Sequence, residues 1–368
     1  DKKKICIIGN NASGAPVSDG GRIKIRLYHE LLLRNGLDTY IIDLDRWHKH
    51  LFRTLQKIKK AIKSNHTILI MAGPKGSRKI IPIVNFLNKS KQSRTVFCPL
   101  GIGTLEQVVS HLTENEVIDF LNNVNYFGIK DKKMAKQLKL LDAILPQNEV
   151  LSACYKQFYN LKNVFVLNNF RDITPTKKKY KVNNILSVVY ASRVCEEKGI
   201  FDLINAVNAI NAVDKRITLD IYGDLQLSNE EKNVFFNNLK NGIRYLGVLD
   251  SSDGISTIKS YDLFVLPTKY SGEGTSGSLI EAFLSGTPAL VSSYSQSKFL
   301  ISDDVDGFIY KINNQTDLES KLLYIYNNRE VLEKIGLSTQ MKSVVYTYEY
   351  NKAKFINLIV GDSKWRYY

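Results

Sequence analysis

Residues 262–293, DLFVLPTKYSGEGTSGSLIEAFLSGTPALVSS, constrain the fold of this chain more than any other stretch. They predict a short buried strand at 262–267, a Gly- and Ser-rich loop at 269–278, a helix with a regular apolar face, and a second buried strand at 288–292. Gly286 stands where glycine commonly ends a helix. This strand–loop–helix–strand order is the repeating unit of a parallel sheet covered by helices.

The junction between this strand and this helix predicts a ligand site. In an open parallel sheet, ligands bind beyond the carboxyl ends of the strands. A helix N-terminus at that edge offers free N–H groups to a phosphate. Glu273 and Glu281 flank the junction, and carboxylates suit the hydroxyl groups of a ribose or a sugar. The alternative interpretation is an exposed loop acid and an acid favoured near a helix N-terminus.

The rest of the chain predicts two α/β domains. A length of 368 residues favours two domains over one. Short apolar runs alternate with helical stretches in the N-terminal half, at 4–9, 38–44, 67–71, 95–98, 125–127 and 142–145. This alternation predicts a doubly wound sheet. Residues 163–171 predict a further strand, the polar residues up to 184 a linker, and residues 315–342 a helix.

Two cations in the C-terminal half predict a diphosphate site. Arg193 follows an aliphatic strand at 185–191, and Lys198 precedes a helix at 201–210. Arg can bind a diphosphate in bidentate fashion, and Lys adds a compact charge. In a chain with 51 basic residues, both are also compatible with ordinary surface positions.

These motifs together resemble the retaining glycosyltransferases of family 4, which have the GT-B fold. Glu273-x7-Glu281 looks like the signature of that family, and SRVCEEKGIFDLINAV at 192–207 resembles its phosphate-binding segment. The segments LDIYGDL, IRYLGVL and DDVDGFIY follow in the expected order. The resemblance implies two Rossmann-like doubly wound domains that face a central cleft. An acceptor-binding domain is expected over 1–170 and a nucleotide-sugar-binding domain over 171–349, with a last helix at about 350–368 packed back on the first domain.

The resemblance also implies roles for individual residues. Arg193, Lys198 and Glu273 are implied to be catalytic: the cations neutralise a leaving diphosphate, and the acid orients the donor sugar. The implied donor-binding residues are Arg193, Lys198, Gly223, Leu246, Glu273, Gly274, Thr275, Ser276 and Glu281. Many family members have a His-Asp pair in the first domain, which this chain lacks near 98–111. The catalytic contacts of the first domain are therefore undefined.

Glycines in the N-terminal half predict close backbone contacts with a ligand. The resemblance implies that Gly20, Gly21, Gly101 and Gly103 bring the backbone close to a diphosphate or an acceptor. The alternative interpretation is ordinary turn glycine. GNNASGAP lacks the Gly-Lys-Ser/Thr ending of a P-loop, and Gly101-x-Gly103 is only a fragment of a dinucleotide fingerprint because Glu106 occupies the third glycine position.

Charge and composition limit the possible partners. The formal net charge is +15, and residues 46–64 predict a basic amphipathic helix. Such a helix suits an anionic inner-membrane surface, although an ordinary sheet-packing helix with a solvated basic face explains it equally. The chain lacks the interleaved aromatic and basic motifs of RNA readers, so no specific nucleic-acid partner is expected. Scattered Cys6, Cys98, Cys154 and Cys195 predict reduced thiols in a cytosolic protein.

We therefore expect a retaining, metal-independent glycosyltransferase. Two localisations stay open: the cytoplasm, and the periphery of the inner face of the cell membrane. The enzyme would move a hexose or N-acetylhexosamine from a nucleotide-diphosphate sugar, first of all a UDP-sugar, to a hydroxyl of a glycan or polyprenyl-diphosphate-linked acceptor. Bacterial surface polysaccharide synthesis, of capsule or O-antigen, is the expected context. No cofactor is expected, because the nucleotide sugar is a substrate, and Asp303, Asp304 and Asp306 predict an exposed turn instead of a metal cluster.

Two alternatives stay open. The chain is also compatible with another GT-B enzyme, such as a nucleotide-sugar epimerase or a sugar phosphorylase. A non-catalytic nucleotide- or nucleic-acid-binding module is the other, and the net charge of +15 is its main support.

Overall fold

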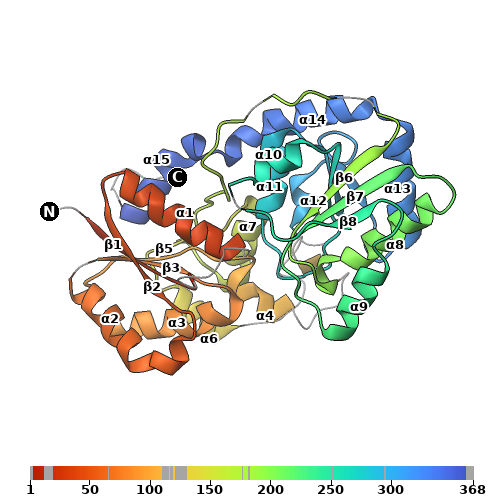
Figure 1. The fold of residues 1–368 in the computed structure, drawn as a ribbon. Helices are drawn as coiled ribbons and strands as arrows, with labels where there is room; N and C mark the ends of the chain where they lie inside the picture. Colours follow the sequence, from red (N-terminus) through yellow and green to blue (C-terminus); the bar gives the residue numbers. More distant parts are fainter. Residues whose placement is uncertain are drawn as a thin grey trace. The chain divides into compact units, whose positions relative to one another are not determined.

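The computed structural model describes residues 3–11, 20–64, 66–109, 116, 119–120, 131–175, 177–180, 183–250, 252–293 and 296–361. The chain divides into two compact units (Figure 1). One comprises residues 1–169 and 349–368, and the other residues 170–348. Each unit contains one parallel sheet. The predicted strand at 125–127 and the last residues of the predicted C-terminal helix lie outside the described residues.

The described residues of the first unit form a sheet of five strands in the order β2-β1-β3-β4-β5. Its strands are β1 (Lys4–Gly9), β2 (Asp38–Asp43), β3 (Thr67–Met71), β4 (Thr95–Phe97) and β5 (Ala143–Ile144). Its helical segments are α1 (Gly20–Arg34), η1 (Trp47–His50), α2 (Leu51–Lys63), α3 (Pro74–Leu87), η2 (Gly103–Leu105), α4 (Glu106–Val109), α6 (Lys132–Leu138), α7 (Glu149–Tyr159) and α15 (Tyr348–Val360). Every residue of β3 is buried, as expected for a central parallel strand.

Helix α15 belongs to the first unit although it comes last in the chain. Phe355 of α15 packs edge-on against Tyr28 of α1, with ring centroids 4.7 Å apart. The Arg94 guanidinium donates hydrogen bonds to the carbonyl oxygens of Leu358 and Ile359, at 2.9 and 3.3 Å. These carbonyls lie in the last turn of a helix, where backbone acceptors have no intrahelical partner. The two contacts fix both the side and the end of α15.

The second unit has a six-stranded sheet in the order β11-β10-β9-β6-β7-β8. Its strands are β6 (Leu186–Ala191), β7 (Ile217–Tyr222), β8 (Ile243–Tyr245), β9 (Leu263–Leu266), β10 (Ala289–Ser292) and β11 (Phe308–Tyr310). Its helical segments are η3 (Glu196–Lys198), α8 (Ile200–Asn211), α9 (Asn229–Asn237), α10 (Gly254–Lys259), α11 (Gly277–Ser285), α12 (Ser297–Leu300), α13 (Gln315–Asn327), α14 (Val331–Lys342) and η4 (Ser343–Tyr346).

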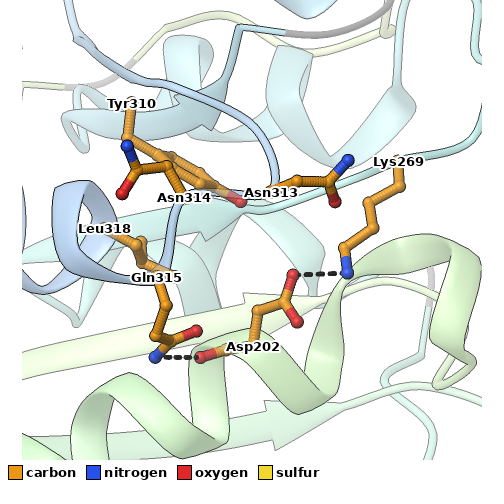
Figure 2. Close-up of a pocket in the computed structure, with 7 residues that line it drawn as sticks. All are labelled: Asp202, Lys269, Tyr310, Asn313, Asn314, Gln315 and Leu318. Atoms are coloured by element: carbon orange, nitrogen blue, oxygen red, sulfur yellow. Dashed lines mark hydrogen bonds and ion pairs between the residues drawn. The ribbon is translucent and has the colours of Figure 1, made fainter. Parts of the chain in front are cut away.

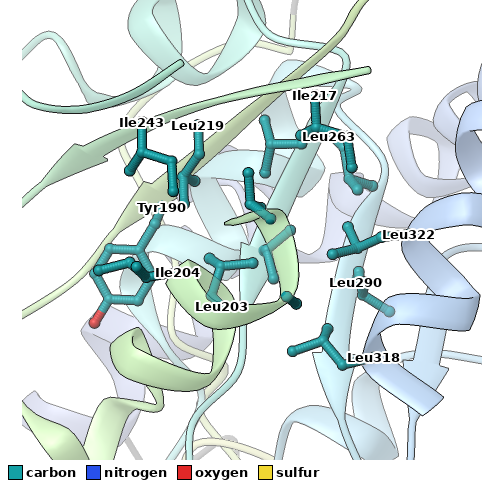
Figure 3. Close-up of a cluster of buried hydrophobic side chains, with 14 of the residues drawn as sticks. Tyr190, Leu203, Ile204, Ile217, Leu219, Ile243, Leu263, Leu290, Leu318 and Leu322 are labelled. Carbon is teal, nitrogen blue, oxygen red and sulfur yellow. The ribbon is translucent and has the colours of Figure 1, made fainter. Parts of the chain in front are cut away.

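Apolar residues of this sheet alternate between two buried clusters. Leu263 and Val265 of β9 join a cluster that includes α8 and α13, while Phe264 and Leu266 join one that includes α10 and α11. This alternation follows from the two-residue period of a strand. Figure 3 shows the first cluster, in which leucines of α8 and α13 meet strand residues such as Leu219 and Leu290. We call the two sides of the sheet the α8 face and the α11 face.

The strand order defines a topological switch point in the second sheet. From β6 the chain adds β7 and β8 on one side, and then β9, β10 and β11 on the other side. The neighbours β6 and β9 are therefore the strands between which the direction reverses. Loops after such a strand pair diverge to opposite faces and leave room for a ligand at their carboxyl ends.

Several predicted boundaries were wrong. Residues 163–171 form no regular strand: Val164 makes an isolated bridge to Ile144, because β5 has only two residues and Pro146 soon follows it. The predicted helix at 315–342 is split into α13 and α14, since the Asn328 side chain donates to the Tyr324 carbonyl at 2.8 Å and the backbone of Asn328 is not helical. Gly20 and Gly21 are the first residues of α1 and do not precede it.

No helix in the described part of the chain is long and apolar enough to cross a lipid bilayer. The four cysteines are all buried and free.

Candidate functional site

The loop after β6 holds Lys198 against the loop after β9. Lys198 is the last residue of η3, and Gly199 follows it in the left-handed conformation with φ of 71°. A Cβ atom at Gly199 would overlap the carbonyl oxygen of Pro267. The two loops therefore touch at a position where only glycine fits. Lys198 lies at the switch point and is only 4% exposed.

A buried ion pair joins these two loops. The Lys198 ammonium contacts Oε2 of Glu273, and the two side chains are 5% and 12% exposed. Thr268 Oγ1 donates to the same oxygen of Glu273 at 3.3 Å. Buried charges are tolerated when they are paired, and breaking such a pair leaves the remaining charge uncompensated. Lys198 and Glu273 are thus brought together, as a shared site requires.

Arg193 joins this pair through Tyr270. The Tyr270 ring centroid lies 5.2 Å from the Lys198 ammonium and 5.8 Å from the Arg193 guanidinium carbon. Both distances suit a cation–π contact. Arg193 also donates to Gln226 Oε1 at 3.2 Å. We call Arg193, Lys198, Tyr270 and Glu273 the donor cluster.

Neutral groups surround the donor cluster. The Tyr190 hydroxyl donates to the Arg193 carbonyl at 2.6 Å. Burial raises the pKa of the Tyr190 hydroxyl and the pKa of the Cys195 thiol, against the opposing effect of the Arg193 charge. Both groups therefore stay protonated near neutral pH. Neither group therefore adds a charge beside the donor cluster.

The N-terminus of α11 lies next in the chain to Glu273. Ser276 occupies the N-cap position, but its side chain makes no capping bond; its Oγ is 3.2 Å from Ser278 Oγ. Gly274 and Thr275 are buried just before it. The first N–H groups of a helix lack intrahelical partners and attract anions. The predicted residues Gly274, Thr275 and Ser276 therefore lead into α11, and the Ser276 side chain does not cap the first N–H groups of this helix.

Glu281 forms an ion pair with Arg171, a residue that the sequence did not connect with it. Arg171 Nε donates to Glu281 Oε1 at 2.8 Å, and the side chains are 10% and 14% exposed. A Cβ at Gly254 would lie 2.5 Å from Glu281 Oε2, so the other oxygen is closely packed as well. Glu281 is in the second turn of α11, and no contact between it and the donor cluster is seen in the described residues. The structure pairs it instead with Arg171.

Gly223 and Leu246 lie at the carboxyl ends of β7 and β8. Gly223 has φ of 147°, and a Cβ there would overlap the Ser192 carbonyl oxygen. Its N–H donates to the Gly247 carbonyl at 2.8 Å. The Leu246 side chain is 43% exposed. These ends form a close-packed backbone surface on the β7 side of Arg193, and Leu246 and Val248 are exposed apolar residues there.

Gly20, Gly101 and Gly103, which were predicted to approach a ligand, all belong to the first unit. Gly101 and Gly103 follow β4 with φ of 62° and 59°. Gly103 is closely packed: a Cβ would lie 2.5 Å from the Tyr155 hydroxyl and 2.6 Å from Pro99. Among the described residues, no heavy atom lies within 4 Å of the Cβ position of Gly20. The role of these glycines in binding stays a prediction.

Two acidic residues of the turn at 303–306 form ion pairs with lysines. Asp303 pairs with Lys321 at 3.0 Å, and Asp306 pairs with Lys342 at 2.8 Å. Asp304 has positive φ of 58°, a conformation typical of a tight turn. Within the described residues, no group of three or more His, Cys, Asp or Glu side chains is arranged to hold a metal ion.

Sequence reasoning missed Arg171, Thr268 and Tyr270. Arg171 had been assigned only to the segment between the domains, and its partner Glu281 is 110 residues away. Thr268 and Tyr270 lie inside the 262–293 stretch, where a hydroxyl and an aromatic ring just after a strand end were a usable signal. Arg171 offered no local signal of this kind.

Comparison with known proteins defines the class of this fold. Its two Rossmann-like units with parallel sheets form the GT-B fold of glycosyltransferases, as in sucrose-phosphate synthase of Thermosynechococcus elongatus. That structure has a TM-score of 0.71 and 15% identity, with 98% of this chain and 99% of the other covered. HepE of Anabaena, solved with UDP-glucose, has a TM-score of 0.68 and 14% identity, with 98% and 100% covered.

The particular family match concerns the second unit. Residues 171–340 match the family described as Glycosyl transferases group 1. An uncharacterised glycosyltransferase of Methanocaldococcus jannaschii is 24% identical over 228 residues, which are 59% of this chain and 57% of that protein. The capsular polysaccharide biosynthesis glycosyltransferase CapM of Staphylococcus aureus is 24% identical over 169 residues, 45% of this chain and 43% of CapM. The chain thus spans about half the length of these relatives, and the solved structures show that it has the GT-B fold.

Proposed function

We propose that this chain is a glycosyltransferase that uses a nucleotide-diphosphate sugar and binds the diphosphate at the donor cluster. One observation carries the proposal: Arg193 and Lys198 converge on the Tyr270 ring at the switch point between β6 and β9, and Lys198 also contacts Glu273. A switch point is where open α/β sheets bind ligands. Two cations beside an uncapped helix start suit the charge of a diphosphate.

Lys198 can serve two partners at once. An ammonium group has three N–H donors, so one can stay with Glu273 while the others reach phosphate oxygens. Arg193 adds planar donors, and its guanidinium contacts the Tyr270 ring and donates to Gln226 Oε1 at 3.2 Å. Both cations stabilise the negative charge that develops on the leaving diphosphate. This kind of preorganised electrostatic stabilisation is typically worth a factor of about 10²–10³ per donor group.

Glu273 is proposed to hold the donor sugar. Both contacts to its carboxylate within the described residues fall on Oε2, where Lys198 and Thr268 bind. We propose that Oε1 accepts hydrogen bonds from sugar hydroxyls and so orients the anomeric carbon. In the transfer step the bond from the anomeric carbon to the phosphate oxygen breaks, and the acceptor oxygen bonds to that carbon. The proton of the acceptor hydroxyl passes to the leaving phosphate.

The finer assignments come from the resemblance to family 4. Retention of anomeric configuration and independence of metal ions are proposed on the Glu273-x7-Glu281 spacing. We propose a UDP-sugar of the hexose or N-acetylhexosamine class as donor, and the UDP-glucose bound by HepE supports this choice. Glu281 is proposed to bind the ribose with Arg171 as its positioning partner. The apolar Leu246 would face the base.

The acceptor is proposed to be a hydroxyl of a glycan or a polyprenyl-diphosphate-linked sugar in bacterial surface polysaccharide synthesis. The likeness to CapM supports this context. Helix α2 supports a membrane-bound acceptor: Ile58, Ala61 and Ile62 are buried, whereas Phe52 is 83% exposed and Leu51 43%. The lysines of this helix, at 57, 59, 60 and 63, are all exposed. An exposed aromatic tip beside basic residues suits an anionic inner-membrane surface.

The test is an assay of UDP release from a panel of UDP-hexoses and UDP-N-acetylhexosamines, with and without polyprenyl-diphosphate sugars. The proposal expects acceptor-dependent release and a new glycoside whose anomeric configuration matches the donor. Release of a free epimeric sugar or formation of a sugar phosphate would instead indicate an epimerase or a phosphorylase. No binding of any nucleotide sugar would contradict the proposal.

A further inference from the structure

A small pocket lined mainly by polar residues lies in the second unit on the α8 face of the sheet, outside the donor cluster (Figure 2). It has a volume of about 170 Å³. Its walls come from the first turns of α8 and α13 and from the loops after β9 and β11, and its lining residues are Asp202, Lys269, Tyr310, Asn313, Asn314, Gln315 and Leu318. None of these residues belongs to the donor cluster. The pocket is therefore a separate site at the same edge of the sheet.

Contacts within the unit hold the pocket walls in place. Lys269 Nζ lies 2.6 Å from Asp202 Oδ2, and each side chain is 27% exposed. The Gln315 side chain donates to the Asp202 carbonyl at 3.3 Å. Asn314 caps α13 by accepting the Asp317 N–H at 3.0 Å. Because these groups are fixed before a ligand arrives, little ordering entropy would be lost on binding.

The chemistry of the lining favours a neutral polyhydroxyl ligand. The charges of Lys269 and Asp202 cancel, which disfavours a free anion. Asp202 is the only carboxylate among the lining residues and is already paired, whereas Ca²⁺ needs six or more oxygen ligands. The lining contains one acidic, one basic and three amide side chains, and a sugar hydroxyl both donates and accepts hydrogen bonds. Leu318 adds an apolar wall for the carbon face of a ring.

Size and position narrow the ligand further. The volume is below the roughly 300–1,000 Å³ typical of pockets for drug-sized ligands, so one small ring fits better than an extended molecule. The Lys269 N–H donates to the Glu197 carbonyl at 2.7 Å, beside Lys198. Lys269 also follows Thr268, which contacts Glu273. A ligand in the pocket would therefore sit against the two loops that carry the donor cluster.

We propose that this pocket binds one pyranose ring, either as a free monosaccharide or as one residue of a glycan, at a site distinct from the donor site. Asp202 accepts from ring hydroxyls, and Lys269 and Asn313 donate to them. A glycan held there is anchored beside the loop that presents Glu273. Because the readout is binding, the proposal does not depend on transferase activity.

Saturation-transfer difference NMR on the whole chain tests the proposal, with glucose, N-acetylglucosamine and maltotriose as probes. Removal of a charged hydrogen-bond donor is expected to weaken binding about tenfold or more in Lys269→Met. The matched control is Lys321→Met, which breaks an ion pair with Asp303 at 3.0 Å, with Lys321 21% exposed, outside the pocket. Binding by this control is expected to equal that of the wild type. Tighter binding of maltotriose than of glucose would identify a glycan site, and equal binding a monosaccharide site.

Two further variants keep the test decisive. Asn313 has positive φ of 53°, so Asn313→Gly removes the amide while keeping a favourable backbone; it is expected to weaken sugar binding even if Lys269→Met fails to fold. Lys198→Ala removes a donor-cluster cation and is expected to leave this sugar binding intact. Sugar signals lost in Lys198→Ala but kept in both pocket variants would place the sugar in the donor site and overturn the proposal. Signals from no sugar, or displacement by inorganic phosphate, would also overturn it.

Discussion

The two ends of the second parallel sheet both hold buried charge but use it differently. At the amino end, the Asp262 carboxylate accepts the Ser187 N–H at 2.8 Å and the Ser187 hydroxyl at 2.7 Å, and pairs with Arg329 at 2.9 Å. At the carboxyl end, Lys198 and Glu273 are equally buried but belong to two loops beside an aromatic ring and a helix start. The contacts of Asp262 connect β6 to the start of β9. The pair of Lys198 and Glu273 leaves hydrogen-bond donors and acceptors that a ligand can use.

This difference shows that burial of a charge does not by itself locate a functional site. Asp262 is saturated by backbone and side-chain donors, so it contributes to stability. Lys198 keeps N–H groups beyond its contact with Glu273, and it lies at a topological switch point. Remaining hydrogen-bond capacity at the carboxyl end is the feature that distinguishes the donor cluster.

The largest expected effect comes from substituting one lysine at each end of the sheet, the buried Lys198 and the partly buried Lys178. Lys198→Ala is expected to reduce turnover of the preferred UDP-sugar about 10²–10³-fold, because a cation that neutralises the leaving group is lost. Lys178, which contacts the Tyr261 carbonyl and Thr287 Oγ1 at the amino end, is the control. Steady-state kinetics of Lys178→Met at low temperature should stay within about twofold of the wild type. Equal losses of turnover in Lys198→Ala and Lys178→Met would contradict the proposed functional difference between the two ends of the sheet.

Next in size are the two buried arginine–carboxylate pairs. Arg171→Met and Arg329→Met should each lower the free energy of unfolding by about 3–5 kcal/mol, because Glu281 and Asp262 lose their buried partners. Urea denaturation measures this loss. Calorimetric titration with UDP should separate the two variants, with affinity reduced in Arg171→Met alone. Unchanged UDP affinity in folded Arg171→Met would show that its pair with Glu281 is purely structural.

Two glycines at the carboxyl end give a smaller, local contrast. Gly223→Ala should destabilise the fold by about 3 kcal/mol, since a Cβ would overlap the Ser192 carbonyl oxygen. Gly247 also has positive φ, of 83°, but no heavy atom of the described part of the chain lies within 4 Å of its Cβ position, so Gly247→Ala should cost only about 1–2 kcal/mol. Thermal denaturation of both variants checks the difference. Equal shifts would mean that backbone conformation, and not the close approach of two loops, determines the need for glycine.

The smallest expected effect is a pH dependence at the amino end. Burial lowers the pKa of the Lys178 ammonium to about 8, against an ordinary value of 10.5. Between these two values the unfolded chain binds the proton more strongly than the folded chain, so this residue makes stability rise with pH. The slope is at most about 1.4 kcal/mol per pH unit, and partial exposure reduces it.

Urea denaturation of the wild type and of Lys178→Met between pH 7.5 and 10 measures this effect. The stability of the wild type relative to the variant should increase with pH. Parallel pH curves would show that Lys178 keeps an ordinary pKa.

Local pattern predicted much of this molecule. The strand–loop–helix–strand order in 262–293 is confirmed as β9, α11 and β10, because short continuous apolar runs, helical apolar spacing and Gly286 act within a few residues. The two-sheet α/β class is confirmed for the same reason. The strand predicted at 163–171 failed because strand pairing depends on a partner, and β5 is too short to supply one.

The site was predictable only in part. Arg193, Lys198 and Glu273 were found because each follows a strand end in the sequence, and strand ends of a parallel sheet share one edge. Their arrangement around Tyr270 depends on loop packing, which has no periodic signal. The pair of Arg171 with Glu281 spans 110 residues, and no local pattern encodes such a contact.

A crystal structure of the chain with UDP tests the central claim most directly. The account predicts that the diphosphate oxygens lie within hydrogen-bonding distance, about 2.7–3.2 Å, of the Lys198 ammonium and the Arg193 guanidinium, at the start of α11. A diphosphate bound elsewhere, with Lys198 still contacting only Glu273 and Tyr270, would contradict it.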